Sequence, residues 1–360
     1  MKSILKNILI SSIFLIAIYQ RLGMFSQVGK DIYAYERAVV DLLEGRNPYI
    51  WTVESFSNPD DPGNHGFAYL PGLIYINLIG YLISLFTKIP FEYLWKIPVL
   101  LADIGVGILI IKILKNDSND KFNFIATILG LLVWFFNPYF FFKQNYVYTD
   151  PIPVFLMLLS LYFLEKDDVL SGSIYAMAVG VKTFPLLLLP IYLFLAKDKI
   201  KFFLASAIVG LTLSIPFMSS LNNFLIYLRG ALFVHGERFV QGRPFLFYVS
   251  YFYNIEFFQI IPFRIYTLLA SFSGWVLVTL IYFKKWIVNK YVLSLISFLT
   301  FYLFTPVLNR TYLIWFIPIL IIGMYNLRKF KLYIFGLGFF WTFYYLYLLP
   351  WKDGFHIWRP

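Results

Sequence analysis

Long apolar stretches recur along the whole chain, separated by polar or basic connections. Most approach the roughly 20 residues that an α-helix needs to cross a bilayer. The stretch 170–196 is too long for one crossing, and Pro185 disfavours helix at the residue before it, so we divide this stretch into two short helices that meet near Lys182. The other stretches are 4–20, 69–87, 91–114, 122–142, 151–164, 201–218, 263–283, 291–304, 312–326 and 332–350.

Two polar segments, 24–67 and 219–262, are much longer than ordinary connections, and such loops often carry function. Clusters of basic residues between the other helices decide the topology, because basic loops stay on the cytoplasmic side. All clusters fall inside only if 69–87 does not cross the membrane. We therefore interpret 69–87 as a re-entrant or surface helix, which leaves about eleven crossings, the N-terminus inside and the C-terminus outside.

The composition agrees with this pattern. Hydrophobic residues make up 60% of the 360 and charged residues 14%, whereas a soluble domain carries roughly 25% charge. The sequence predicts an all-α polytopic protein, multi-pass in the cell membrane, with a single transmembrane domain over 1–360. In a membrane protein, the net charge of +11 is explained by basic residues on cytoplasmic loops, which orient the chain in the lipid bilayer. We therefore expect no nucleic-acid partner. The absence of cysteine excludes disulfides and thiol chemistry.

Arginine is distributed unevenly in this topology. The inside clusters are nearly all lysine, with Arg328 as the exception. Because arginine binds phosphate and carboxylate in a forked geometry, arginines on the outer side suggest an anionic ligand there. The alternative is that they extend to lipid headgroups. The arginines that fall outside or near the outer edge are Arg21, Arg37, Arg46, Arg229, Arg238, Arg243, Arg264, Arg310 and Arg359.

The first outer loop, 24–67, contains a segment with apolar residues at helical spacing, 31–44. Most of its charged residues lie on other faces, which predicts an amphipathic helix that could lie on the membrane. Gly45 and Pro48 end this helix. Asp31 stands at its start, where a carboxylate can cap a helix.

Four groups of motifs occur in order along the chain. They are 31–35 with 42–49 and 67–71, then 137–139 with 148–151, then 178–185 with 189–190, and finally 305–315 with Pro318. Together they resemble the outer loops, the K-x-x-P helical hairpin and the late outer turn of the GT-C glycosyltransferases. The chain is most similar to the polyprenol-phosphate-mannose-dependent mannosyltransferases, which include the catalytic subunit that adds the first mannose to GPI anchors.

The resemblance implies a reaction. A sugar, by this resemblance mannose, leaves a polyprenyl-phosphate-linked donor while a hydroxyl of a glycan or glycolipid acceptor attacks it with inversion. Such a reaction needs a carboxylate to take the hydroxyl proton and cations to stabilise the departing phosphate. The residues implied are Asp31 as catalytic base, Lys182, Arg243 and Arg310 as ligands of the donor phosphate, and Tyr33, Tyr69 and Asp150 as substrate-binding residues.

The sequence predicts no certain cofactor. The GPI-type enzymes carry an Asp-x-Asp at the position of Asp31, whereas this chain has Gly29 two residues earlier, so the case for a carboxylate-held divalent metal is weak. His65 and His235 lie in outer loops, but 3 His and no Cys provide few metal ligands.

Most of these candidates also have a structural explanation. Asp31 and Asp150 stand at helix starts, where a carboxylate can cap the helix. Lys182 lies within reach of the bilayer, where an ionisable residue is usually functional. Asp103 lies in the middle of an apolar segment, and we expect a structural role for it, paired with Lys182 or another buried cation.

Two other functions remain as alternatives. A transporter or flippase of lipid-linked glycans also combines many helices with basic cavities. Such proteins usually lack a long outer loop with an amphipathic helix, and they often show internal repeats, of which we find none that is convincing. The other alternative is a non-catalytic subunit of a glycosylation complex.

Overall fold

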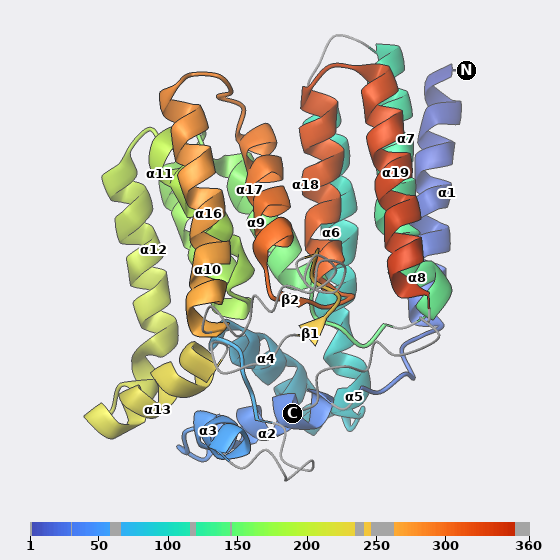
Figure 1. Cartoon of the computed structure of the whole chain (residues 1–360). Coiled ribbons are helices and arrows are strands. Elements are labelled where there is room, and N and C mark those ends of the chain that lie inside the picture. The colour runs from blue at the N-terminus through green and yellow to red at the C-terminus, as the bar shows by residue number, and fades with distance from the viewer. Residues whose placement is uncertain are drawn as a thin grey trace.

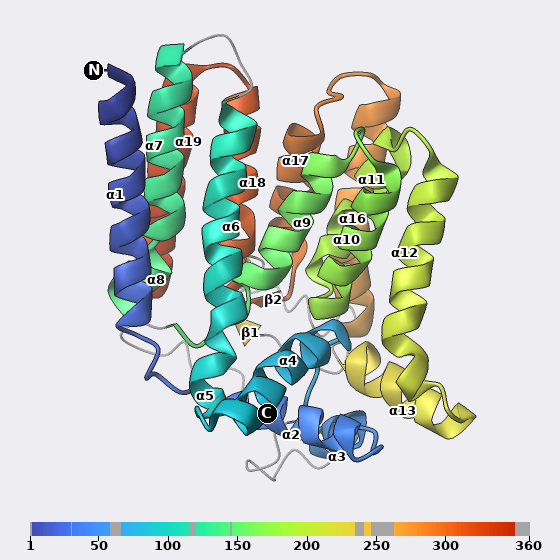
Figure 2. The ribbon, with the colours of Figure 1, turned by 180° about the vertical axis from the view of Figure 1, so that it is seen from behind.

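The computed structural model describes residues 2–29, 31–57, 66–115, 120–144, 146–234, 241–245 and 263–349. Its helices form an upright bundle and a transverse layer at one end of that bundle (Figures 1 and 2). Each apolar stretch that was predicted to cross the membrane corresponds to an upright helix. These are α1 (Lys2–Leu22), α6 (Lys96–Leu114), α7 (Asp120–Phe135), α9 (Pro151–Phe163), α10 (Asp168–Val181), α11 (Leu189–Leu195), α12 (Lys199–Ser214), α16 (Phe263–Phe283), α17 (Lys290–Phe304), α18 (Tyr312–Asn326) and α19 (Phe330–Leu348).

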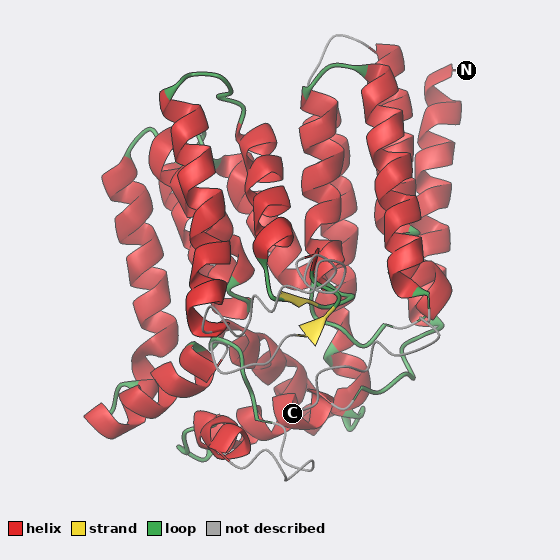
Figure 3. Ribbon diagram, viewed as in Figure 1, coloured by secondary structure: helices red, strands yellow, loops and turns green. Residues whose placement is uncertain are grey.

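Helices account for nearly all regular structure in the described residues (Figure 3). Within the described ranges, four helical stretches are long and apolar enough to span a membrane, namely Ile4–Leu22, Phe91–Leu114, Phe122–Lys143 and Lys199–Phe217. Several further apolar helices, among them α9, α10, α17 and α18, are shorter. The prediction of an all-α polytopic membrane protein is confirmed.

The transverse layer comes largely from the first outer loop and the segment after it. Helix α2 (Asp31–Leu43) is the predicted amphipathic helix, and it buries Ile32, Tyr35 and Val39. The other members of the layer are α3 (Tyr49–Ser57), α4 (Gly72–Thr87), α5 (Phe91–Leu94) and α13 (Leu221–Ala231). Because α4 lies across the bundle end, its position agrees with a segment 69–87 that does not cross (Figure 2).

A close contact between glycines holds α4 on the bundle. A Cβ atom added to Gly72 would lie 2.6 Å from the carbonyl carbon of Gly180 in α10. Only a residue without a side chain permits this approach. Gly180 comes two residues before Lys182, so the contact places the start of α4 next to the end of α10.

The division of 170–196 into two helices is confirmed. Lys182 has an extended backbone, with φ −157° and ψ 141°, and stops α10. The chain then turns through the 3-10 helix η1 (Phe184–Leu188) and returns as α11. Pro185 stands within the first turn of η1, where its missing N–H removes no helical hydrogen bond.

A two-residue parallel pairing connects the second long loop to the late outer turn. Strand β1 (Gln241–Gly242) pairs with β2 (Val307–Leu308) near the transverse layer (Figure 1). Gly242 has φ 72°, and a Cβ atom there would lie 1.8 Å from the Leu308 carbonyl oxygen. The short helix α8 (Pro138–Lys143) lies at the same end of the bundle. Positions 235–240 and 246–262 of the predicted loop 219–262 lie outside the described residues.

The two ends of the bundle differ in charge. The end where α1 begins carries the basic clusters on the connections between helices (Figure 1). The opposite end carries the transverse layer and, among the described residues, most of the arginines. Described basic residues at the first end are Lys6, Lys112, Lys115, Lys166, Lys197, Lys199, Lys201, Lys284, Lys285, Lys290, Arg328, Lys329 and Lys331.

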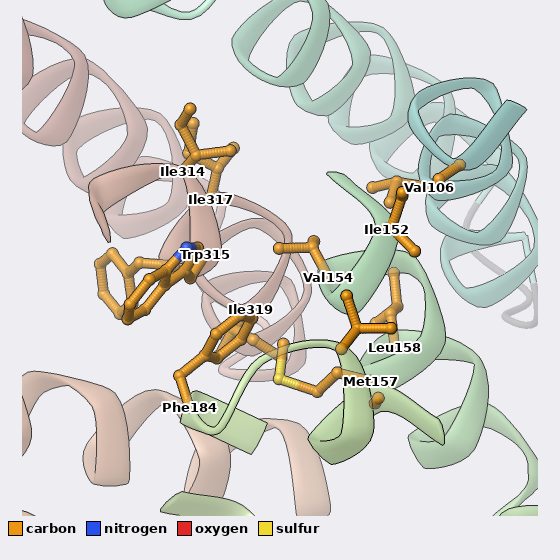
Figure 4. Close-up of a cluster of buried hydrophobic side chains, with 14 of the residues drawn as sticks. Val106, Ile152, Val154, Met157, Leu158, Phe184, Ile314, Trp315, Ile317 and Ile319 are labelled. Carbon is orange, nitrogen blue, oxygen red and sulfur yellow. The ribbon is translucent and has the colours of Figure 1, made fainter. Parts of the chain in front are cut away.

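The core is largely apolar, and an ion pair is buried within it. Side chains of α6, α9, η1 and α18 pack together around Met157 and Ile317 (Figure 4). Asp103 forms an ion pair with Arg21, and both side chains are almost completely buried. Arg21 also donates to the carbonyl oxygen of Phe135, at 3.0 Å. Asp103 thus pairs with a buried cation, as expected, and that cation is Arg21 rather than Lys182.

Candidate active site

A cavity of about 480 Å³ lies between the transverse layer and the bundle. This volume is within the range of about 300–1,000 Å³ that is usual for small-molecule sites. Its walls come from the start of α2, the segment before α4, the hairpin of α10 and η1, one face of α16, and the turn between α17 and α18. Three residues predicted from the sequence, Asp31, Tyr69 and Lys182, meet in its lining.

Asp31 enters the cavity from the transverse layer. It is the first residue of α2, and its side chain is exposed while the apolar face of α2 is buried beneath it. The helix is therefore fixed by packing, and its first carboxylate is left available to a ligand. Tyr33 is 63% exposed and is not among the described residues that line the cavity.

Lys182 and Asp150 form a buried pair at the base of the cavity. The Lys182 Nζ atom lies 2.7 Å from Asp150 Oδ1, and the two side chains are 15% and 4% exposed. Trp315 Nε1 donates to the same carboxylate oxygen. Asp150 precedes α9, but its side chain accepts no capping hydrogen bond. Its carboxylate instead orients the Lys182 ammonium and the Trp315 indole.

Tyr69 lies within the electrostatic influence of both charged sides of the cavity. Burial raises the pKa of its phenol, the Lys182 ammonium lowers it, and the carboxylates of Asp31 and Asp150 raise it further. The net pKa is raised, so Tyr69 is neutral at physiological pH and keeps its O–H as a hydrogen-bond donor. The Tyr69 ring also lies 5.7 Å from Lys182 Nζ.

Stacked aromatic rings form another part of the lining. The rings of Phe184 and Trp315 are parallel within 7°, with centroids 4.2 Å apart. Tyr312 stacks on Trp315 with centroids 3.9 Å apart. Figure 4 shows Phe184 and Trp315 side by side, one from the hairpin and one from α18. The stack fixes the indole that holds Asp150.

The wall formed by α16 is largely apolar. Leu268, Ser271, Phe272 and Trp275 line the cavity from one face of the helix. Leu268 and Phe272 are 57% and 47% exposed, so this wall continues onto the surface of the bundle. The cavity therefore combines a charged base with an apolar side, which suits an amphipathic ligand.

These α16 residues were not predicted from the sequence. Their spacing is that of one helix face, but many apolar helices of this chain show the same spacing. Trp315 was part of a motif but was not proposed as a site residue. The feature that could have identified Trp315 is its indole N–H, because a buried tryptophan needs a hydrogen-bond acceptor.

The two predicted arginines differ in their surroundings. Arg310 stands between Asn309 and Thr311, which both line the cavity, and its side chain is exposed. Its guanidinium forms no ion pair or hydrogen bond with the described residues. The Arg243 guanidinium donates to the carbonyl oxygens of Tyr347 and Leu349, at 2.9 and 3.1 Å, beyond the described lining.

The described residues contain no group of three or more His, Cys, Asp or Glu side chains that could hold a metal ion. His65 and His235, the histidines considered as metal ligands, lie outside the described residues.

Comparison with known proteins identifies one family. The model of glycosyltransferase family 87 matches residues 77–308, which include Asp150 and Lys182 but not Asp31. No curated protein and no solved structure matches the chain.

Proposed function

The chain belongs to glycosyltransferase family 87 and is a membrane glycosyltransferase, and on this premise we propose that it transfers mannose from a polyprenyl-phosphate donor to a glycan or glycolipid. The acceptor lies on the outer face of the membrane, and the transfer inverts the anomeric carbon. The observation that carries the proposal is the cavity in which the Asp31 carboxylate and the Lys182 ammonium line different walls.

The proposed reaction has one displacement step. Asp31 accepts the proton of the acceptor hydroxyl, whose oxygen forms a bond to the anomeric carbon. The bond between that carbon and the phosphate oxygen breaks, and its electron pair leaves with the polyprenyl phosphate. Lys182 and Arg310 stabilise the charge that develops on this phosphate.

The charges at the site support a role for Arg310 in addition to Lys182. Lys182 is already balanced by Asp150, so the pair alone offers little net attraction for a phosphate. Arg310 is exposed next to the lining and provides a forked guanidinium. Arg243 stays a proposed phosphate ligand, although its guanidinium is engaged by two carbonyl groups in this structure.

The apolar wall supports a lipid-linked donor. A nucleotide-sugar donor is polar throughout, whereas a polyprenyl-phosphate sugar joins a charged group to a long hydrocarbon chain. The charged base of the cavity suits its phosphate, and Leu268 and Phe272 on α16 suit the first isoprene units. Tyr33 and Tyr69 remain proposed contacts of the sugar.

The proposed side of the membrane follows from the basic end of the bundle. Connections rich in lysine stay in the cytoplasm, so the end that carries the transverse layer and the cavity faces outward. The N-terminus is then inside, and α19 runs from the inside to the outside.

A reconstituted transfer assay tests the proposal. The purified chain in lipid nanodiscs receives polyprenyl-phosphate mannose and a glycolipid acceptor, and free polyprenyl phosphate and mannosylated acceptor are measured together. We expect both products in equal amounts, with neither formed from a nucleotide-linked mannose. If the nucleotide sugar is the better donor, the lipid-donor proposal fails. If labelled donor crosses a proteoliposome membrane intact and no phosphate is released, the protein is a flippase.

A further inference from the structure

A second cavity lies at the basic end of the bundle, opposite the transverse layer. It has a volume of about 200 Å³ and lies between the ends of α6, α9 and α18 and the start of α17. Lys166, Lys290 and Arg328 line it together with aromatic residues. No Asp or Glu is among its described lining residues. The cavity between the transverse layer and the bundle is called the outer cavity below, and the mechanism proposed for it uses none of these groups.

These cations contact several neutral groups among the described residues. Lys290 donates to the carbonyl oxygen of Leu164 at 2.8 Å, and it also pairs with the half-exposed Glu165 at 3.0 Å. Lys166 lies 3.4 Å from the centre of the Tyr162 ring. Arg328 donates to the Tyr325 hydroxyl at 3.2 Å. Among the described residues, Glu165 is the carboxylate that pairs with one of these three cations, so the described groups carry more positive than negative charge.

The general excess of lysine at this end does not explain the position of Lys290. Lys166 and Arg328 are exposed at this end, as are Lys199 and Lys284 on loops or helix ends. The Lys290 side chain, in contrast, is only 12% exposed, and burial of an ammonium is unfavourable unless other groups stabilise it. Tyrosines surround the cations, and tyrosine favours the headgroup region of a bilayer.

We propose that this basic cavity binds a phosphate group at the leaflet of the basic end, supplied by an anionic phospholipid headgroup or by free phosphate. Concave basic sites between helix ends suit phosphate because several cations approach one group from different sides. Arg328 binds two phosphate oxygens through its forked guanidinium, and Lys166 and Lys290 act as point charges. The site is distinct from the outer cavity and does not depend on the transferase mechanism.

The test removes two charges inside the cavity and, as a control, two charges outside it. The pocket variant is Lys166→Gln with Arg328→Gln, and the control variant is Lys284→Gln with Lys331→Gln. The control side chains are exposed at the same end and are not among the described lining residues. The two proteins therefore lose the same charge. Lys166→Gln alone provides a milder change if the pocket variant folds poorly.

Two probes separate the sources of phosphate. Native mass spectrometry measures retention of phosphatidylglycerol over phosphatidylcholine, and inorganic phosphate is titrated in a thermal-shift assay. We expect the pocket variant to bind the relevant probe about 30-fold more weakly, since each cation near the surface contributes roughly a fivefold to sixfold factor. The control should stay within about twofold of the unmodified protein.

Each outcome decides the proposal. Selective loss of phosphatidylglycerol in the pocket variant supports a headgroup site, and selective loss of the phosphate response supports a free-phosphate site. Equal weakening in the pocket and control variants would show a general charge effect and overturn the proposal. Absence of binding by both probes would also overturn it. Asp31→Asn should bind both probes normally, which separates this proposal from the transferase proposal.

Discussion

Asp150 is the residue that most constrains the base of the outer cavity. One oxygen of its carboxylate accepts hydrogen bonds from Lys182, at 2.7 Å, and from Trp315. The pair is buried, so loss of either charge leaves the other without compensation. Asp150 therefore determines both the charge of the cavity and the position of the group that we expect to face the donor phosphate.

A double-mutant cycle on this pair is the first prediction. Asp150→Asn or Lys182→Met should each lower the free energy of unfolding by about 3–5 kcal/mol. The double variant should lose clearly less stability than the two single variants lose together, because it leaves no unpaired charge. Denaturant unfolding in bicelles measures the three values. The exposed pair Asp198 and Lys201 is the matched control and should show no measurable coupling.

The second prediction concerns Asp31. Asparagine caps a helix about as well as aspartate but cannot accept a proton as a base. Asp31→Asn should therefore keep the fold while the rate of sugar transfer falls by roughly 10²–10⁴. Initial rates at saturating donor measure this change.

Asp167→Asn is the control for Asp31→Asn. Asp167 caps α10 by accepting from the Leu170 N–H at 2.9 Å, far from the outer cavity. It should keep near-normal transfer. Normal transfer by a well-expressed Asp31→Asn protein would contradict the assignment of Asp31 as base.

At this scale the sequence identified several residues but not their partners. Asp31 and Tyr69 were predicted from the resemblance to GT-C glycosyltransferases, and Lys182 from the same resemblance and from its ionisable side chain within reach of the bilayer. The pairing of Lys182 with Asp150, and of Asp103 with Arg21, depends on how helices far apart in sequence pack. Apolar patterns do not encode that choice of partner.

At the scale of elements, the contact between α4 and α10 positions the hairpin that carries Lys182. The two helices approach so closely that Gly72 faces the backbone of Gly180. The same transverse helix also donates from the Tyr75 hydroxyl to the Leu213 carbonyl oxygen of α12, at 3.0 Å. Helix α4 thus braces two upright helices beside the cavity.

Gly72→Ala tests this brace. A Cβ atom at position 72 would lie 2.7 Å from the Gly180 carbonyl oxygen, so the helices must separate. We expect stability to fall by about 1–3 kcal/mol and transfer to fall with it. Gly338→Ala is the control, because nothing lies within 4 Å of its added Cβ. In a helix this change should be neutral or stabilise by up to about 1 kcal/mol. Equal thermal stability of both variants would contradict the brace.

Helix positions were predictable because bilayer length and hydropathy restrict each upright helix independently. The break at Lys182 was visible from Pro185. The pairing of β1 with β2 was not, because two residues provide no periodic signal and the contact joins distant loops. The apolar wall on α16 was also hidden, since lipid-facing and cavity-facing residues have the same composition.

At the scale of the whole molecule, orientation is the property to test. The chain contains no cysteine, so single introduced cysteines report sidedness without background. Asn222→Cys in α13 should react with an impermeant maleimide from outside intact cells, and Lys199→Cys should react only after permeabilisation. The opposite labelling pattern would place the cavity on the cytoplasmic side.

The unequal lengths of the upright helices place the base of the outer cavity below the rim of the bundle. Helices α17 and α18 have 15 residues each, whereas α16 has 21. At 1.5 Å per residue the difference is about 9 Å. Figure 1 shows α17 and α18 ending short of α16 toward the transverse layer.

This recess sets the dielectric environment of the reacting charges. Attraction between a phosphate and Lys182 acts through low-dielectric surroundings, where mobile ions screen it poorly. The exposed Arg310 is screened by salt, so the test uses the Arg310→Gln variant, whose KM for the lipid donor should change by less than about twofold between roughly 0.05 and 0.5 M salt. The basic cavity opens at the other surface, and its affinity for phosphate should fall steeply over the same range. A strongly salt-dependent donor KM would place the reacting phosphate in bulk water instead.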